Sequence, residues 1–108
     1  MYLIKAIVRP EKKDEVLYEL ASAGFYAATV VDVVGRGKQR GIKIGNIVYD
    51  EIPKVMIIMG VQDNDKDDII SVILRTAKTS EKGAFGDGKI FVSPLDGAYT
   101  VSSGAKGL

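Results

Sequence analysis

The stretch from Ile52 to Val61 reads I-P-K-V-M-I-I-M-G-V and is apolar almost throughout. A run of this length and character predicts a strand with little exposure on either face, placed inside a sheet. Neither this stretch nor any other reaches the ~18 to 20 apolar residues that cross a bilayer. We therefore expect one compact domain of 108 residues around this strand, without membrane insertion. Because the N-terminus shows no cleavable leader, we expect a cytoplasmic protein.

Hydrophobic periodicity and turn signals divide the rest of the chain into alternating elements. In the first predicted helix the apolar residues Val16, Leu17, Leu20 and Ala21 share one face, and Gly24 is a stop signal. The predicted order is a strand at 2–8, a helix at 12–23, a strand at 25–34, a long basic loop at 35–45, the strand at 52–61, a helix from the acidic stretch at 63–68 to about 78, a loop at 79–88 and a strand at 89–94, with a short stub at 99–101.

The order βαββαβ predicts an α+β fold of the ferredoxin-like kind. Two right-handed β-α-β crossovers share a four-stranded antiparallel sheet, and both helices cover the same face of it. The strands at 25–34 and 52–61 are too apolar for a sheet whose other face is open to water. We therefore expect the uncovered face to be buried against copies of the same chain in a closed homo-oligomer.

Composition excludes several kinds of chemistry and partner. The chain contains no Cys and no His, so disulfides, thiolate catalysis and imidazole chemistry are excluded. The 15 basic and 14 acidic side chains nearly cancel, which argues against nucleic acid or an anionic membrane as a main partner.

The segment F-G-D-G-K-I-F-V, from Phe85 to Val92, combines a glycine turn with a cation at the start of a strand. A Gly-Asp-Gly turn exposes its N–H groups as a concavity that suits an anion, with Lys89 at its rim. The alternative is an ordinary tight turn that leads into a strand. Taken alone, the residues do not separate these two readings.

A second glycine-rich, basic segment, G-R-G-K-Q-R-G, runs from Gly35 to Gly41. In the predicted fold it follows the second strand, and the turn at Gly86 precedes the fourth. Those strands lie at opposite edges of the sheet, so we expect the two loops to be far apart within one chain. In a symmetric oligomer they can meet and form one anion pocket in each interface.

Several of these motifs together resemble the PII nitrogen-regulatory proteins, the GlnB and GlnK family, from Met1 to about Val101. The most specific is T-S-E-K-G-A-F-G-D-G-K-I-F-V-S-P, supported by the G-x-G-x-Q-x-G pattern at Gly35 and by P-K-V at Pro53. The resemblance implies a single domain over residues 1–108 with a T-loop at about 36–50, a B-loop at about 79–88 and a C-terminal segment at about 96–108. It also implies a homotrimer that binds ATP or ADP in the inter-subunit clefts, with 2-oxoglutarate beside Mg-ATP, and that regulates a target without being an enzyme.

The resemblance also implies roles for individual residues. It assigns Thr29 to the adenine surroundings; Gly37, Lys38 and Gln39 to the base of the T-loop; Gly86, Asp87, Gly88 and Lys89 to the phosphate-binding turn; Gln39 also to Mg²⁺ and 2-oxoglutarate; and Lys54 to the distant carboxylate of that acid. A compact ammonium such as that of Lys89 suits a triphosphate. For Gln39 the alternative is a solvated loop amide, and for Lys54 a surface lysine at a strand start.

The sequence departs from the family at two places. Thr100 and Ser102 stand where the family commonly has two arginines that clamp the phosphates, and Lys78, Lys82 and Lys106 are candidate substitutes. The T-loop lacks the usual modifiable tyrosine, since Tyr49 lies too close to Pro53, so we expect no uridylylation. The T-loop is instead similar to that of the nif-linked PII subgroup, whose members act on dinitrogenase together with a sister PII chain.

Two other functions remain open at the level of sequence. One is a PII-like trimer that has altered or lost nucleotide sensing, in keeping with the missing arginines. The other is a small acylphosphatase-like enzyme, because the ferredoxin-like scaffold supports many activities. Against an enzyme, we find no general base, no nucleophile with a partner and no metal-ligand cluster in the sequence.

Overall fold

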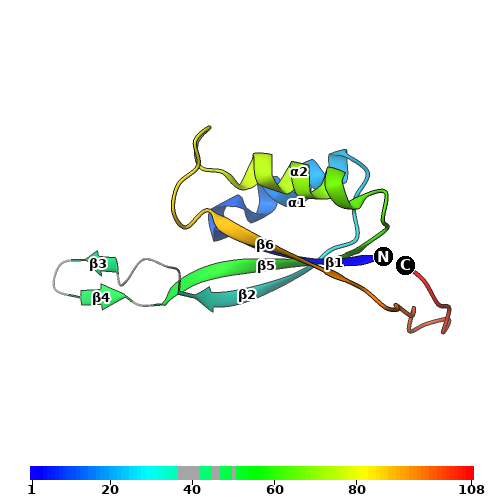
Figure 1. Cartoon of the computed structure of the whole chain (residues 1–108). Helices are drawn as coiled ribbons and strands as arrows, with labels where there is room; N and C mark the ends of the chain where they lie inside the picture. The colour runs from blue at the N-terminus through cyan, green and yellow to red at the C-terminus, as the bar shows by residue number, and fades with distance from the viewer. Residues whose placement is uncertain (37–41, 45–46, 50) are drawn as a thin grey trace.

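The structure, a computed structural model, describes residues 1–36, 42–44, 47–49 and 51–108. A four-stranded antiparallel sheet contains β2 (Thr29–Gly35), β5 (Ile52–Val61), β1 (Tyr2–Val8) and β6 (Gly88–Pro94), in that order across the sheet. Helices α1 (Lys13–Ser22) and α2 (Lys66–Ala77) pack on one face, and a 3-10 turn η1 (Pro10–Lys12) precedes α1. Figure 1 shows both helices above the sheet, as the predicted ferredoxin-like order requires.

The core lies between the helices and the sheet. Alternate residues of β1 and β5 point into it, because side chains along a strand alternate between the two faces. Its largest fully buried side chains are Ile4, Leu20, Ile57, Ile69, Ile73, Val8 and Val16. The predicted apolar face of the first helix is therefore confirmed at Val16 and Leu20.

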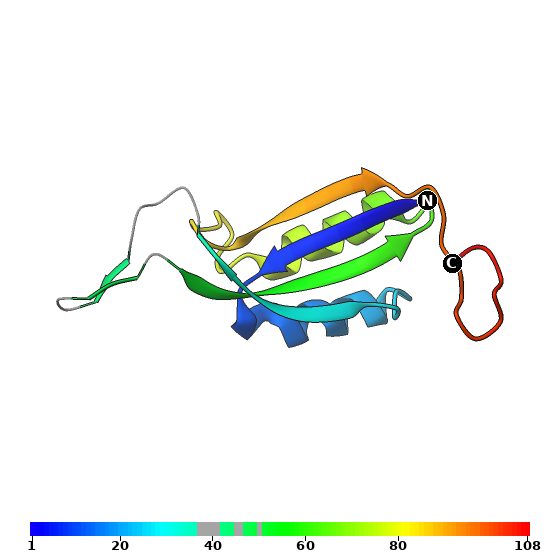
Figure 2. The same ribbon diagram turned by 90° about the horizontal axis from the view of Figure 1, so that it is seen from below.

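The other face of the sheet carries no helix (Figure 2). In β5 every second side chain is buried against the helices, whereas Lys54, Met56 and Ile58 between them are half-buried on the uncovered face. The prediction of little exposure on either face of this strand is therefore correct for the helix side only. Val31 of β2 and Phe91 of β6, on the same uncovered face, are 40% and 52% exposed.

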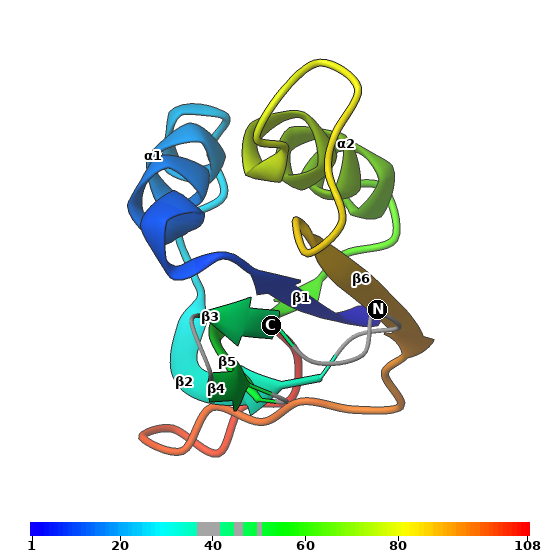
Figure 3. The same cartoon turned by 90° about the vertical axis from the view of Figure 1, so that its left-hand side faces the viewer.

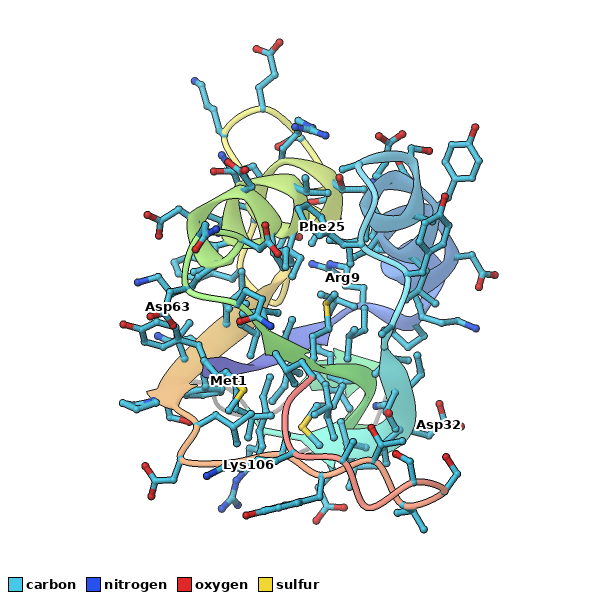
Figure 4. The ribbon with its side chains drawn as sticks, turned by 90° about the vertical axis from the view of Figure 1, so that its right-hand side faces the viewer. Met1, Arg9, Phe25, Asp32, Asp63 and Lys106 are labelled. Carbon is cyan, nitrogen blue, oxygen red and sulfur yellow. The ribbon has the colours of Figure 1, made fainter. Side chains whose placement is uncertain are left out.

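The second strand begins later than predicted, at Thr29 instead of residue 25. The Gly24 N–H donates to Ala21 and the Phe25 N–H donates to Leu20, so these residues close the end of α1. Phe25 packs against the core between the two helices (Figure 4), and its apolar character reflects that contact instead of a strand.

The long loop predicted after β2 contains a two-stranded sheet. Strands β3 (Ile42–Ile44) and β4 (Ile47–Tyr49) pair antiparallel, with Ile42 opposite Tyr49, at the end of the molecule remote from both termini (Figure 1). The stub predicted at 99–101 is reduced to a single bridge between Tyr99 and Lys106.

The two termini lie close together (Figure 1), and the N-terminal amine forms an ion pair with Asp63 at 2.6 Å. The segment after β6 passes below the sheet (Figure 3) and carries Lys106 on that side (Figure 4). In the described part of the chain, neither helix has the length and apolar character needed to cross a membrane.

Candidate functional site

The site is built where β1 ends and β6 begins. In the antiparallel register Val8 lies opposite Gly88 and Ile7 opposite Lys89, so the end of the first strand forms a wall beside the glycine turn. A Cβ atom on Gly88 would lie 1.9 Å from the carbonyl oxygen of Ile7, and Gly88 has φ +131. Only glycine fits at this position, and the turn consequently lies directly against β1.

Asp87 is the centre of a hydrogen-bond network. Its Oδ1 accepts from Arg9 Nε at 3.0 Å and from the Thr79 hydroxyl at 2.9 Å, and its Oδ2 accepts from the Ala84 N–H at 2.8 Å and the Thr79 N–H at 3.3 Å. Burial acts to raise the pKa of this carboxyl, but the hydrogen bonds from Ala84, Thr79 and Arg9 outweigh burial and lower the pKa to about 2. Asp87 is thus an ionised group that joins both ends of the B-loop to β1.

Two further cationic contacts hold the carbonyl side of the turn. Arg9 Nη2 donates to the Phe85 carbonyl at 3.0 Å, and the ammonium of Lys54 donates to the Gly86 carbonyl. Burial, followed by the nearby charge of Arg9, lowers the pKa of Lys54. With its carbonyls engaged, the turn leaves its N–H side available: in the described part of the chain the Gly86 N–H makes no hydrogen bond.

This contact network corrects one expectation about distance. The predicted opposite-edge positions of β2 and β6 are confirmed. However, a Cβ on Gly35 would lie 3.8 Å from Cγ of Lys54, whose ammonium reaches Gly86. One side chain therefore connects the base of the T-loop to the B-loop within a single chain, so the two are closer than predicted.

The other predicted residues are distributed as follows. Thr29, the first residue of β2, lies exposed at the far edge of the sheet from Lys89 and pairs with Ile58. Lys89 is exposed and forms no ion pair among the described residues. Gly37, Lys38 and Gln39 lie outside the described residues.

Arg9 and Thr79 belong to the site but were not predicted from the sequence. Arg9 directly follows β1 and precedes Pro10, and only the pairing of Val8 with Gly88 reveals that it lies beside the turn. Thr79 follows the second helix and carries no sequence signal of its own.

The candidate substitutes for the missing arginines fall into two groups. Lys78 and Lys82 line a cavity of about 730 Å³ beneath the B-loop, which has apolar walls from α2 and β6. Lys106 lies at the end of the sheet where the termini meet, together with Thr100 and the turn at 101–103 (Figures 1 and 4). Within one chain, only Lys78 and Lys82 of these three are close to the B-loop.

The residues at this turn suit an anion. They offer a free glycine N–H and an unpaired ammonium among the residues that the structure describes, and the half-buried apolar side chains of Ile7, Met56 and Ile58 lie on the same face of the sheet. The ion pair with Arg9 balances the negative charge of Asp87, so the Asp87 carboxylate repels a ligand phosphate only weakly.

Fold and site together define the class of this protein. Residues 1–105 match the family model described as "Nitrogen regulatory protein P-II", and the chain belongs to that family. It is therefore a nitrogen-regulatory signalling protein and not an enzyme.

The curated relatives narrow the family to a subgroup. A "Nitrogen fixation nifHD region GlnB-like protein 1" of Methanobacterium ivanovii and one of Methanococcus maripaludis are each 53% identical over 108 residues, covering all of both chains. A "Nitrogen regulatory protein P-II 2" of Methanothermobacter thermautotrophicus is 40% identical over 96% of this chain and 91% of its own length. The similarity is thus greater to the nitrogen-fixation relatives than to this P-II protein.

Proposed function

We propose that this protein is a homotrimeric, cytoplasmic sensor that binds ATP or ADP between subunits and regulates nitrogenase through its T-loop. The observation that carries the proposal is the Gly86 to Lys89 turn, which presents a free N–H and an unpaired cation, among the described residues, beside β1. Anions bind where backbone N–H groups converge with a positive side chain. Family membership makes an adenine nucleotide the preferred anion.

The two predicted ends of the nucleotide site lie on opposite edges of one sheet. Thr29 and Lys89 stand on the two outer strands of one sheet, separated by β5 and β1. Neighbouring strands are about 4.8 Å apart, so the two residues are roughly 14 Å apart across the sheet. Family membership favours a nucleotide that lies between Thr29 of one chain and Lys89 of the next.

For 2-oxoglutarate, we propose that Lys54 and Arg9 supply the cations. Both reach the same turn, and the lowered pKa of Lys54 reflects burial and the charge of Arg9. A carboxylate placed between them relieves this repulsion, which favours a dianion. Mg²⁺, held in part by Gln39, supplies charge neutralisation for the phosphates when it is bound.

The test is isothermal titration of the wild-type protein with ATP, ADP and AMP, each with and without Mg²⁺ and 2-oxoglutarate. We expect Lys89→Met to weaken ATP binding more than AMP binding, because its ammonium faces the end of the phosphate chain. Lys13→Met on α1, on the other side of the sheet, is the matched control and retains wild-type affinity. Absence of heat for every nucleotide at high protein concentration refutes the sensor and favours a trimer without nucleotide sensing.

Nitrogenase is the proposed target because relatives at 53% identity are named for the nitrogen-fixation region. The assay is inhibition of purified dinitrogenase by this protein, alone and with its sister PII chain, at varied ATP and 2-oxoglutarate. Sedimentation of the same samples reports whether the active species is a homotrimer or a mixed oligomer. Failure to inhibit in the presence of the sister chain removes the nitrogenase assignment and leaves nucleotide binding unaffected.

A further inference from the structure

The charged strand positions on the uncovered face of the sheet are all basic. The register places the lysines Lys5, Lys54 and Lys89 on this face, and none of the strand positions that share it is Asp or Glu. The remaining positions are mostly apolar, among them Leu3, Ile7, Met56, Ile58 and Phe91. The strand residues therefore give this face a positive charge.

The cations near this face differ in whether they are already engaged. Arg9 pairs with Asp87, and Lys54 donates to the Gly86 carbonyl. Lys5 and Lys89 form no ion pair with any described residue. Lys89 belongs to the proposed phosphate turn, whereas Lys5 has no role so far.

Lys5 lies next to Lys89 on the sheet. It stands on β1 opposite Phe91, and Lys89 stands opposite Ile7, so the two lysines are diagonal neighbours on adjacent antiparallel strands. Such residues have Cα atoms about 7 to 8 Å apart and side chains on the same face, within reach for long side chains. Their two ammonium groups can therefore contact one phosphate chain.

Lys5 is also an unusual residue for its surroundings. It is exposed in the single chain, but its cross-strand neighbours are Phe91 and Ile58. The proposed trimer buries this uncovered face. Covering an ammonium without a counter-ion is strongly unfavourable. Either a ligand or an acid from another copy must then supply the negative charge.

We propose that Lys5 contacts the phosphate nearest the nucleoside, one step further from the glycine turn than Lys89, an inference that rests on the proposed nucleotide site. Lys5 lies one same-face row further from the glycine turn than Lys89, so a phosphate chain whose end lies at the turn brings an inner phosphate to Lys5. Lys5 thereby supplies from within the sheet a charge that Thr100 and Ser102 do not carry.

The experiment compares Lys5→Met, Lys5→Arg and Lys89→Met with the wild-type protein by isothermal titration with ATP, ADP and AMP. We expect Lys5→Met to weaken all three by a similar factor of about tenfold, since all three contain the inner phosphate. Lys5→Arg retains most of the affinity, and Lys89→Met affects ATP most. Lys13→Met controls for the loss of one positive charge.

Three outcomes overturn the inference. If Lys5→Met binds like the wild-type protein, Lys5 does not contact the ligand, although the nucleotide site stands. If Lys5→Met changes trimer stability in sedimentation without ligand and leaves affinity unchanged, its counter-ion is an acid of another copy. If the wild-type protein binds no nucleotide, both the inference and the proposed function fail.

Discussion

Replacing Asp87 by asparagine tests whether one carboxylate holds the B-loop in place. In the native protein its two oxygens accept four hydrogen bonds, from Arg9, twice from Thr79 and from Ala84. An amide has one oxygen and one NH₂ group, so in either orientation an NH₂ faces donors on one side. The Asp87→Asn substitution also removes the charge that pairs with Arg9.

The expected loss follows from these contacts. Hydrogen bonds to charged groups contribute about 1.5 to 3 kcal/mol each. The substitution removes two of the four hydrogen bonds. The loss is partly offset, because the Thr79 hydroxyl can rotate to accept a hydrogen bond and because the Asp87 side chain, 15% exposed, admits water. We expect the free energy of unfolding to fall by about 2 to 3 kcal/mol, which lowers Tm by roughly 10 to 20 °C for a domain of this size.

The assay is thermal and urea unfolding at fixed protein concentration without ligand, with the oligomeric state checked, because assembly contributes to apparent stability. Glu81→Gln is the matched control: it removes the same charge from the same loop, where Glu81 is exposed and forms no ion pair with the described residues. If Asp87→Asn unfolds within about 0.5 kcal/mol of the wild-type protein, the network does not hold the loop.

Three more perturbations follow from the same geometry. Folding lowers the pKa of Asp87 from 3.8 to about 2, so its contribution to the free energy of unfolding is present above about pH 4 and is lost as the pH falls through 2. Urea midpoints of the wild-type protein should therefore drop over that pH window, and those of Asp87→Asn should drop less. In Gly88→Ala the added Cβ meets the Ile7 carbonyl oxygen at 1.9 Å, and the free energy of unfolding in urea should fall by about 3 kcal/mol or more. A variant as stable as the wild-type protein would contradict this close packing. Gly60→Ala meets the tips of two side chains, Leu108 at 2.9 Å and Leu95 at 3.5 Å, and should cost less than about 1 kcal/mol, with faster hydrogen exchange in the last residues. Unchanged exchange there argues against the contact with Leu108.

The fold was predictable because hydrophobic spacing and turn residues agree along most of the chain. The apolar run at Ile52–Val61 and the β-forming residues of Tyr2–Val8 indicated the central strands, and the spacing of Val16 and Leu20 indicated the first helix. The prediction erred at Phe25, whose apolar side chain belongs to the helix–sheet core, since burial alone does not distinguish a strand from a connection. The I-K-I and I-V-Y pair separated by Gly-Asn was a hairpin signal that the glycine and lysine content of the loop obscured.

The candidate site was predictable only as far as its local motif. The turn at Gly86–Lys89 is visible in the sequence because glycines, an acid and a lysine adjoin a strand. The roles of Arg9 and Lys54 depend on contacts between residues more than 30 positions apart, 78 for the Arg9–Asp87 bond and 32 for Lys54–Gly86. No local pattern contains such contacts, which is also why the sequence motif alone did not reveal that the Asp87 oxygens bind the protein's own donors.

The two outer strands of the sheet have a consequence for how the chain is made and handled. β2 and β6 each have one side without a strand partner among the described residues of a single chain, and Val31, Val34 and Phe91 on them are exposed. Unpaired strand edges with apolar side chains recruit other chains, correctly or not. A single chain with both sheet edges uncovered is therefore expected to self-associate or precipitate as its concentration rises, so expression level and protein concentration decide how the chain can be handled.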